Sequence, residues 1–388
     1  MMVDNRNQDT KRVAIICQLD GYANGLKPVE VQRFLREHGH EVHLVDTYYL
    51  ARASSASWSL ASKLPSPGLR RIALYAIEAA STLLTRRLNL GRRYLSYYLL
   101  IADFRLRRSI LKALLPIDKF DLIICESPHD AGFLTVPTSA RVLYDCPTPW
   151  ADEIYFEGRL TERQHHRLRR LEAEVFESVD YLAFHWESYA RYAVDHYRIS
   201  GRNLITLNFG CAPVAQRAEF SNPPHVVYLG SLSSKFIDLP LLSRLTGLYP
   251  RIDVYGGPPP DASLGLNYLG YAPSSVLRQY QLGLITCTQD ELRREGFSAK
   301  HLQYLAHGLP VLVPVWRRHI GLLRGSVGYD ERTFLSVIGA LSNEKEWRRL
   351  SEEAYAQAQR LAWKETLRPL ESVLRDSSHP SSPHDSTR

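Results

Sequence analysis

Cysteine, methionine and long hydrophobic runs are all scarce in this chain of 388 residues, which contains five cysteines and two methionines. The cysteines are scattered and odd in number, and no two form a CxxC pair, so a zinc site is not expected and a reducing compartment fits. No stretch reaches the roughly 18 apolar residues of a membrane-spanning helix. The opening segment MMVDNRNQDTKR is polar and unlike a secretory signal. We therefore expect a cytoplasmic protein without a bound metal.

A dinucleotide-binding fingerprint is missing as well. The loop after the first predicted strand reads QLDGYANG and lacks the GxGxxG pattern. That pattern provides the tight turn and the close backbone approach that a dinucleotide needs. The sequence therefore argues against a nicotinamide-dependent dehydrogenase.

Positive charge is concentrated in one segment, residues 70–108. This segment has nine arginines, two acidic residues and no lysine, an excess equal to the whole net charge of +7. Tyrosines and aliphatic runs accompany the arginines, a pattern typical of a helix that lies on an anionic membrane surface. The alternative is that the apolar face packs on the core and leaves the arginines in water. Nucleic acid is not expected as a partner.

Short apolar runs alternate with helical patterns along the chain. Runs such as RVAIICQ, FDLIICES and ARVLYDC are typical of buried parallel strands. After the segment AEFSNPP the same alternation starts again at HVVYLGS. This predicts an α/β protein of two facing, Rossmann-like, doubly wound domains, at 1–217 and 218–375, with a C-terminal helix. The tail 376–388 is rich in Ser, Pro and His and is expected to be disordered.

The start of the second half carries a candidate anion site. In YLGSLSS, Gly230 and Ser231 follow a predicted strand. A glycine there lets phosphate oxygens approach the backbone, and the N–H dipoles favour an anion. An ordinary strand-to-helix turn has the same sequence pattern, so this motif is weak alone.

The segment REGFSAKHLQYLAHGLPVLVP is more specific. Glu295 lies in a glycine turn after a predicted strand, and Lys300 falls in the first turn of the next helix. Gln303 lies on the same helix face as Lys300 by its spacing. Lys300 and the helix N-terminus together suit a phosphate, and the Gln303 amide suits sugar hydroxyls. The alternative is an amphipathic helix whose polar residues are merely solvated.

This segment resembles the donor-site motif of the GT-B glycosyltransferases, especially family 4, in which two glutamates are separated by seven residues. Glu295 matches the first glutamate and Gln303 replaces the second. The order AKHLQYLAHGLP is still more similar to the xanthan-type glucuronosyltransferases. LGSLSSKFID and FDLIICES also resemble segments of that group. The resemblance implies that Glu295 lies near the donor sugar, Lys300 contacts the diphosphate and Gln303 binds the ribose.

The resemblance implies a glycosyltransferase of the hexosyltransferase type, active in polysaccharide biosynthesis. It would move a sugar from a UDP- or GDP-linked donor to a glycan, a glycolipid or a small acceptor, with no further cofactor and no metal. Two alternatives stay open. One is a GT-B nucleotide-sugar epimerase, and the other is a non-catalytic relative that only binds nucleotide or glycan. The enzyme would be cytoplasmic, and a peripheral position on the inner face of the membrane is the alternative.

An inverting transfer needs a carboxylate as general base near the acceptor hydroxyl. The carboxylates that follow predicted strands in the first half are Glu126, Asp145, Asp152 and Glu153. In the xanthan-type group an aspartate lies four residues after the tyrosine of the strand that matches LYDC, and here that position is Thr148. Asp152 is our first choice, because the loop PTPW can direct it toward the acceptor. A retaining mechanism centred on Glu295 is the alternative, and each carboxylate alone also fits a helix cap or a surface group.

The acceptor side is placed by fold analogy only. Asn24 and Gly25, with Lys27, lie in the first loop after a strand and are expected to touch the acceptor. His129 follows another strand and is a candidate for contact with a sugar or phosphate. An ordinary loop histidine has the same signal.

Overall fold

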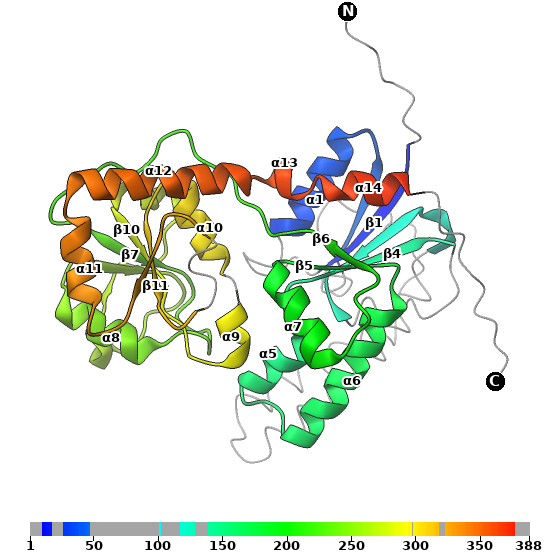
Figure 1. The fold of residues 1–388 in the computed structure, drawn as a ribbon, viewed down its shortest axis with the longest axis horizontal. Helices are drawn as coiled ribbons and strands as arrows, with labels where there is room; N and C mark the ends of the chain where they lie inside the picture. Colours follow the sequence, from blue (N-terminus) through cyan, green and yellow to red (C-terminus); the bar gives the residue numbers. More distant parts are fainter. Residues whose placement is uncertain are drawn as a thin grey trace, which may run out of the picture. The chain divides into compact units, whose positions relative to one another are not determined.

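The structure is a computed structural model that describes residues 10–17, 26–46, 101, 117–128, 139–296, 298–317 and 323–376. The chain divides into two compact units, Met1–Asn208 with Leu367–Arg388, and Phe209–Thr366 (Figure 1). The sequence prediction drew this boundary at 217/218 and assigned everything up to 375 to the second domain. The basic segment 70–108, apart from residue 101, and the tail beyond Asp376 lie outside the described residues, so their predicted roles stay predictions.

The first unit has a six-stranded sheet in the order β2-β1-β3-β4-β5-β6, and all its strand pairs are parallel. Its strands are β1 (Arg12–Cys17), β2 (Glu41–Asp46), β3 (Leu122–Cys125), β4 (Arg141–Cys146), β5 (Tyr181–Phe184) and β6 (Leu204–Thr206). Its helices are α1 (Leu26–Glu37), α5 (Trp150–Phe156), α6 (Glu162–Ser178), α7 (Glu187–Tyr197) and α14 (Pro369–Arg375), with a 3-10 helix at Ile117–Lys119. The central strands are covered on both faces, and their sequences are therefore continuous runs of apolar residues.

The second unit has another six-stranded parallel sheet, in the order β12-β11-β10-β7-β8-β9. Its strands are β7 (Val226–Leu229), β8 (Ile252–Tyr255), β9 (Asn267–Tyr268), β10 (Leu282–Leu284), β11 (Val311–Pro314) and β12 (Ser326–Tyr329). Its helices are α8 (Leu239–Leu248), α9 (Glu291–Glu295), α10 (Ala299–Ala306), α11 (Phe334–Leu341), α12 (Glu344–Arg360) and α13 (Trp363–Thr366), with 3-10 helices at Ala262–Leu264 and Ser274–Gln279. The prediction of two α/β units with parallel sheets is confirmed.

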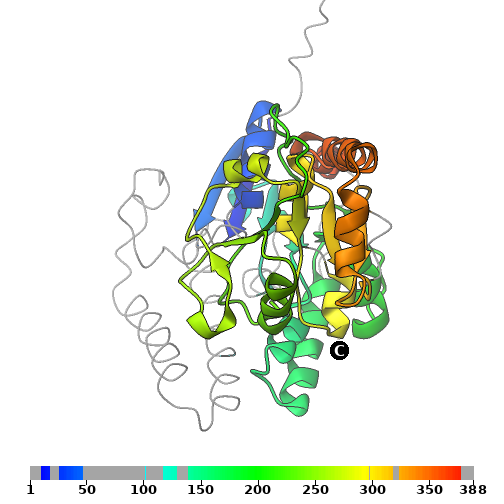
Figure 2. The same ribbon diagram turned by 90° about the vertical axis from the view of Figure 1, so that its left-hand side faces the viewer.

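The helices α10 and α11 each pack on α12 in the second unit. Figure 2 turns this unit toward the viewer and shows α11 and α12 along the same side of its sheet. Gly283 of β10 allows α10 to lie close, because a Cβ on this glycine would meet the Tyr304 ring at 2.4 Å. The absence of a side chain in the strand therefore fixes how near the helix that carries Lys300 and Gln303 lies to the sheet.

Helix α14 belongs to the first unit because it is bound to the amino-terminal edge of that unit's sheet. The Arg141 guanidinium donates to the carbonyl oxygens of Val373, at 2.6 Å, and Asp376. The Tyr181 hydroxyl donates to the Asp376 carboxylate at 2.9 Å. The Arg141 guanidinium thereby satisfies carbonyl groups that a helix leaves open at its C-terminus.

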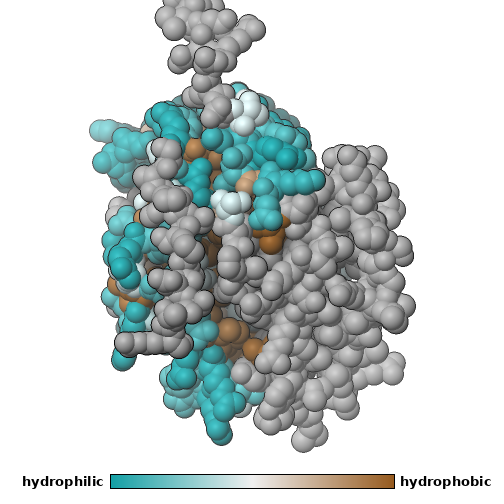
Figure 3. All heavy atoms as spheres, turned by 90° about the vertical axis from the view of Figure 1, so that its right-hand side faces the viewer, coloured by the Kyte–Doolittle hydropathy of each residue, from teal (hydrophilic) through white to brown (hydrophobic). Residues whose placement is uncertain are grey.

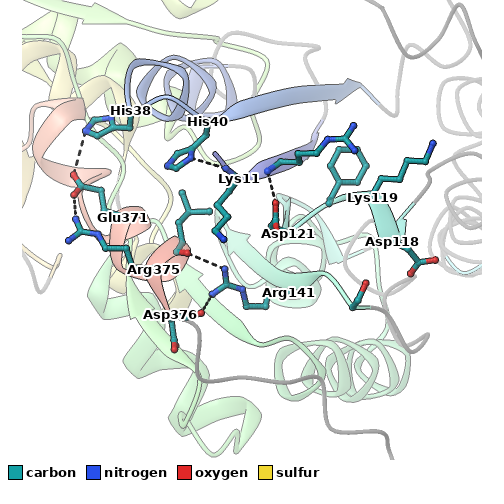
Figure 4. Close-up of a pocket in the computed structure, with 14 residues that line it drawn as sticks. Lys11, His38, His40, Asp118, Lys119, Asp121, Arg141, Glu371, Arg375 and Asp376 are labelled. Atoms are coloured by element: carbon teal, nitrogen blue, oxygen red, sulfur yellow. Dashed lines mark hydrogen bonds and ion pairs between the residues drawn. The ribbon is translucent and has the colours of Figure 1, made fainter. Parts of the chain in front are cut away.

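The same edge holds a cavity of about 690 Å³ (Figure 4). It lies where strands begin, next to Arg12 and Arg141, and so at the opposite edge from the strand ends where α/β sheets bind ligands. Several of its charged groups bind one another, as in the contacts of Glu371 with His38 at 3.5 Å and with Arg375. The cavity marks the attachment of α14 rather than the candidate site.

The described surface is mostly polar where it can be seen. Figure 3 shows hydrophilic side chains over most of the described residues on one face, with small separate hydrophobic patches. Within the described ranges, no helix combines the length and apolarity needed to cross a bilayer.

Candidate functional site

The second sheet reverses its strand order between β7 and β10. The strands β8 and β9 continue on one side of this pair, and β11 and β12 continue on the other. The Tyr304 hydroxyl of α10 sits between the two strand ends, where it accepts from the Leu229 amide at 2.8 Å and donates to the Leu284 carbonyl at 3.3 Å. Ligands of doubly wound sheets bind at such a switch point.

Two glycines follow neighbouring strands at this switch point and leave backbone groups uncovered by a side chain. Gly230, directly after β7, has a φ of 157°, and a Cβ there would lie 2.8 Å from the Lys300 amine. Gly256, directly after β8, has a φ of 116°, and a Cβ there would meet the Gly230 carbonyl oxygen at 2.5 Å. A side chain is unfavourable at both positions because of the φ, and at Gly256 the backbone of Gly230 also fills the space. The predicted pair of Gly230 and Lys300 is thus in direct contact.

Lys300 lies in the first turn of α10, as the sequence predicts. Its amine donates to the Tyr228 hydroxyl at 2.6 Å and lies 4.1 Å from the centre of the Tyr228 ring. Burial lowers the pKa of Lys300 to about 8, Cys287 opposes this shift, and Arg317 adds to it. Tyr228 was not predicted as a site residue, although its place two residues before Gly230 put it in the same motif.

Two arginines approach this region and were missed by the sequence prediction. Arg317, three residues after β11, donates to the Gly296 carbonyl oxygen. The Arg293 guanidinium lies 3.3 Å from the centre of the Phe236 ring. Sequence spacing gave no signal for Arg317, because only the pairing of β10 with β11 brings it to the loop that holds Gly296.

The remaining predicted donor residues lie on the neighbouring loops and helices. Glu295 is the last residue of α9 and is half-buried, and Gln303 is half-buried one turn after Lys300 in α10. Ser231 is exposed, and its hydroxyl lies 2.9 Å from that of Ser233. Ser298, the residue before α10, makes no side-chain cap. The first amides of α10 are therefore not capped by that side chain.

In the first unit, Asp145 is buried in an ion pair with Lys27. The Lys27 amine lies 2.8 and 2.7 Å from the two carboxylate oxygens and donates to the Leu207 carbonyl at 2.7 Å. Burial raises the pKa of Asp145 and lowers that of Lys27, while each charge opposes the shift of the other. Both side chains are only 1% exposed, so they connect β4, α1 and the segment after β6 rather than meeting solvent.

His185 and Glu126 lie around this pair. The His185 Nε2 atom is 3.6 Å from the Asp145 carboxylate, and burial followed by the charge of Lys27 holds the pKa of His185 well below its usual value. Both causes favour the neutral form of the His185 ring. Glu126, after β3, is half-buried and close enough to Lys27 to favour its charged form. Asp145 and Glu126 were both predicted as candidates for the general base. The structure places both of them near the Lys27 amine.

Asp152 lies in α5 and is fully buried. Its carboxylate forms ion pairs with His165 and with Arg169, the latter at 3.0 Å. Burial raises the pKa of Asp152, but hydrogen bonds from His165 and Arg169 outweigh this effect and lower it overall. This is the environment of a carboxylate that anchors α5 to α6, and the role of general base stays a prediction for this residue.

The carboxylate next to it has a different setting. Glu153 is half-buried, and its Oε2 atom accepts a hydrogen bond from the Thr148 hydroxyl at 2.6 Å. Thr148 occupies the position where the resemblance leads one to expect an aspartate. A carboxylate therefore does lie at this position, but it comes from the first turn of α5 and not from the loop.

Helix α5 is capped by a side chain distant in sequence. The Glu172 carboxylate of α6 accepts from the amides of Trp150 and Ala151, at 2.7 and 2.9 Å, and from the Tyr197 hydroxyl at 2.8 Å. Burial raises the pKa of Glu172 to about 8, although these donors oppose the shift. In the sequence Glu172 is one charge among many in a polar helix, so nothing there marked it.

Three predicted acceptor-side residues, Asn24, Gly25 and His129, lie outside the described residues, and their roles stay predictions. Across the part of the chain that the structure describes, no group of three or more His, Cys, Asp or Glu side chains is arranged to hold a metal ion. The prediction of a metal-free site stays a prediction.

No family model and no curated protein matches the sequence. Solved structures do match the fold. Sucrose-phosphate synthase from Thermosynechococcus elongatus aligns with a TM-score of 0.63 at 10% identity, over 94% of this chain and 98% of that one. The α,α-trehalose 6-phosphate synthase from Burkholderia multivorans aligns with a TM-score of 0.61 at 13% identity, over 95% and 98%.

A glycosyltransferase from Rickettsia africae aligns with a TM-score of 0.56 at 12% identity, again over 95% of this chain and 98% of that one. These matched structures are glycosyltransferases of the GT-B type. At such low identity the likeness establishes the fold and not the reaction. The chain therefore has the GT-B fold, with two α/β units of six parallel strands each.

Proposed function

We propose that the protein is a glycosyltransferase that moves a sugar from a nucleoside-diphosphate sugar to a hydroxyl of a glycan, a glycolipid or a small molecule. The observation that carries the proposal is the contact of Lys300 with Gly230 at the switch point of the second sheet. A half-buried cation, a glycine and a helix N-terminus meet there, and together they suit a phosphate group. The GT-B fold supports the same reading.

In the proposed complex the Lys300 amine leaves Tyr228 and pairs with the donor's diphosphate. The N-terminus of α10 adds its partial positive charge to the same group. Gln303, one turn further along α10, is proposed to bond the ribose hydroxyls, as the sequence resemblance implies. Glu295, at the end of α9, is proposed to lie near the donor sugar.

In the reaction the bond between the sugar's anomeric carbon and the diphosphate oxygen breaks, and a bond to the acceptor oxygen forms. The bonding electrons leave with the nucleoside diphosphate, whose growing charge Lys300 and the helix terminus stabilise, so a metal is not required. The acceptor hydroxyl gives up its proton to a carboxylate. Asp152 was the sequence-based choice for this role, and Glu153 is a second candidate, because it is half-buried and bound to Thr148.

The finer identity of donor and acceptor is also a proposal. The similarity of AKHLQYLAHGLP to the xanthan-type glucuronosyltransferases favours polysaccharide biosynthesis with a UDP- or GDP-linked sugar. If the basic segment 70–108 binds an anionic leaflet, a lipid-linked acceptor is favoured. Sedimentation with anionic vesicles tests this membrane binding separately. The wild type is compared with a variant in which Arg86, Arg87, Arg92 and Arg93 are changed to Gln.

A thermal-shift screen tests the donor assignment. The full chain is melted with UDP, GDP and their common sugar derivatives, each also assayed for nucleotide release. A ligand present at 100 times its dissociation constant stabilises the folded state by about 2.7 kcal/mol, which a melting curve resolves. Binding with turnover supports a transferase, and tight binding without turnover supports the non-catalytic relative. If no nucleotide raises the melting temperature, the proposal is wrong.

A further inference from the structure

We infer that Glu172 is a positioning residue for the transfer: through the first turn of α5 it places the Glu153 carboxylate at the carboxyl edge of the first sheet. This inference rests on the proposed function, in which Glu153 is a candidate for the base that takes the acceptor's proton. It gives a buried residue, which cannot itself touch a substrate, a role in the rate of the reaction.

The first argument is the place of Glu153. Only residues 147–149 separate the end of β4 from the start of α5, so the first turn of α5 lies at the carboxyl end of that strand. Ligands of parallel α/β sheets bind at this edge. The Glu153 Oε2 atom accepts from the Thr148 hydroxyl at 2.6 Å. Burial raises the pKa of the Cys146 thiol, and the charges of Glu172 and Glu153 add to this shift, so both carboxylates lie close to the last residue of β4.

The second argument is that α5 has no cap of its own. A helix leaves its first amides without partners, and the residue before α5 is Pro149, which makes no side-chain cap. The helix has seven residues, a length at which an isolated helix is only marginally stable in water. The Glu172 carboxylate supplies the missing acceptors, at 2.7 Å from the Trp150 amide and 2.9 Å from the Ala151 amide. The start of α5 is therefore fixed by α6.

The third argument is that Glu172 is itself fixed. The residue is only 2% exposed, and the Oε2 atom that accepts from the Ala151 amide also accepts from the Tyr197 hydroxyl of α7 at 2.8 Å. Three donors from two other helices therefore engage its two oxygens. Because Glu172 is enclosed in this way, it can act on the reaction only through α5.

The two carboxylates in the first turn of α5 point in different directions. Asp152 faces α6, where it pairs with His165 and Arg169. Successive residues of a helix point about 100° apart, and Glu153 is bonded to the loop after β4 instead. A shift of the first turn would therefore move Glu153 relative to the acceptor. A misplacement of about 1 Å can lower a rate by about 10²-fold.

Kinetics of single variants test the positioning role on the full chain. Nucleotide release from the donor sugar that binds tightest in the melting screen gives kcat, and calorimetry with the nucleoside diphosphate of that donor gives Kd. Glu172→Gln keeps one acceptor oxygen in place of two, so it should lower kcat by about tenfold or more, while Kd changes by less than about twofold. Tyr197→Phe removes one of the three donors and should lower kcat by about threefold, as for one ordinary hydrogen bond.

The matched control is Tyr181→Phe. The Tyr181 hydroxyl also donates to a carboxylate, that of Asp376 at 2.9 Å, but Tyr181 is the first residue of β5 and so lies at the opposite edge of the same sheet. Neither kcat nor Kd should change in this variant. Melting curves give the temperature range in which each variant is folded, and all rates are measured inside that range.

A double-variant cycle separates positioning from general stability. In the Glu153→Gln background, Glu172→Gln should lower kcat by less than about a further twofold, because the carboxylate that Glu172 positions is already gone. Two independent losses would multiply instead. If Glu172→Gln is unfolded in the assay range, Tyr197→Phe takes its place in the cycle.

Three results would overturn the inference. One is an unchanged kcat in Glu172→Gln. The second is a loss by the same factor with and without the Glu153 carboxylate. The third is full turnover in Glu153→Gln, which would show that this carboxylate has no part in the reaction. Failure of the proposed function looks different, because then the wild type itself would bind no nucleotide sugar or release no nucleotide, and the inference would fail with it.

Discussion

The amine of Lys300 lies 2.6 Å from the hydroxyl of Tyr228 and above the ring of the same residue. Without a ligand, this tyrosine supplies the polar and π-electron contacts that a half-buried amine needs. The contact is not strong enough to offset burial, because the pKa of Lys300 is lowered to about 8. A phosphate at Gly230 would therefore meet an amine that changes its charge within the range of ordinary assays.

Nucleoside-diphosphate binding should accordingly depend on pH through Lys300. Binding favours the protonated amine, so the affinity should be constant below pH 8 and should fall as the pH rises above 8, by up to about tenfold per pH unit. Calorimetry with UDP between pH 7 and 9.5 measures this, since the phosphates themselves are ionised throughout. In Lys300→Arg the charge no longer titrates in this range, and the dependence should disappear. An identical pH profile in both proteins would exclude Lys300 as its source.

Cys287 should report occupancy of the donor site. It is half-buried, whereas Cys17, Cys125, Cys146 and Cys211 are buried. Because Lys300 and Arg317 both lie close to its thiol, a bound diphosphate should restrict access to it. Labelling with a small alkylating reagent, followed by mass spectrometry, should show Cys287 as the most rapidly modified of the described cysteines, and UDP should slow its labelling. UDP should give no protection in Lys300→Met. Protection of all the cysteines equally would instead indicate general stabilisation of the fold.

The sequence predicted the parts of the donor site that lie within one motif, and it missed those that depend on strand order. Gly230 and Lys300 were each predicted from a local pattern, and the fold then brought them into contact. Arg317 reaches Gly296 only because β11 pairs with β10, which no local pattern reveals. The edge strand β12 was missed for a related reason. Its sequence SVGY is short and half-exposed, so it lacks the continuous apolar run that marked the buried strands.

The first unit shows the same limit more strongly. Asp145 and Lys27 are separated by 118 positions in the sequence. Taken singly, each has only the sequence pattern of a polar residue near the end of a strand or helix. Only the structure shows that they neutralise one another in the interior. The same holds for Glu172, whose contact with the start of α5 joins residues 21 and 22 positions apart.

Removal of one partner from the Lys27–Asp145 pair should destabilise the first unit severely. Lys27→Met leaves a buried carboxylate without its cation, a change that costs about 3–5 kcal/mol in comparable buried pairs. The double variant Lys27→Met with Asp145→Asn removes both charges and should recover much of that loss. Urea denaturation of the three proteins gives the comparison. A double variant no more stable than Lys27→Met alone would show that the Asp145 charge is not the cause.

Glu172 should make the stability of the first unit fall as the pH rises from about 4.5 to about 8. Its pKa is raised by burial to about 8 in the folded chain, so the folded state holds a proton that the unfolded state has already released in this range. The folded state is therefore favoured at the acid end of the window and loses this advantage toward pH 8. In Glu172→Gln the neutral side chain cannot titrate, and the dependence of the melting temperature on pH should be flatter between 5 and 8. An unchanged profile would show that the three hydrogen-bond donors keep Glu172 ionised throughout.

The last prediction separates the two carboxylates at the start of α5. Asp152 is enclosed by His165 and Arg169, so Asp152→Asn should lower the melting temperature by weakening the attachment of α5 to α6. Glu153 is half-buried and held by Thr148, so Glu153→Gln should leave the melting temperature nearly unchanged.

If Glu153 is the general base, Glu153→Gln should lower the turnover number by about 10²–10⁴ at unchanged donor affinity. A loss of turnover confined to Asp152→Asn, measured well below its melting temperature, would return the role to Asp152. Full turnover in both variants would favour a retaining mechanism centred on Glu295.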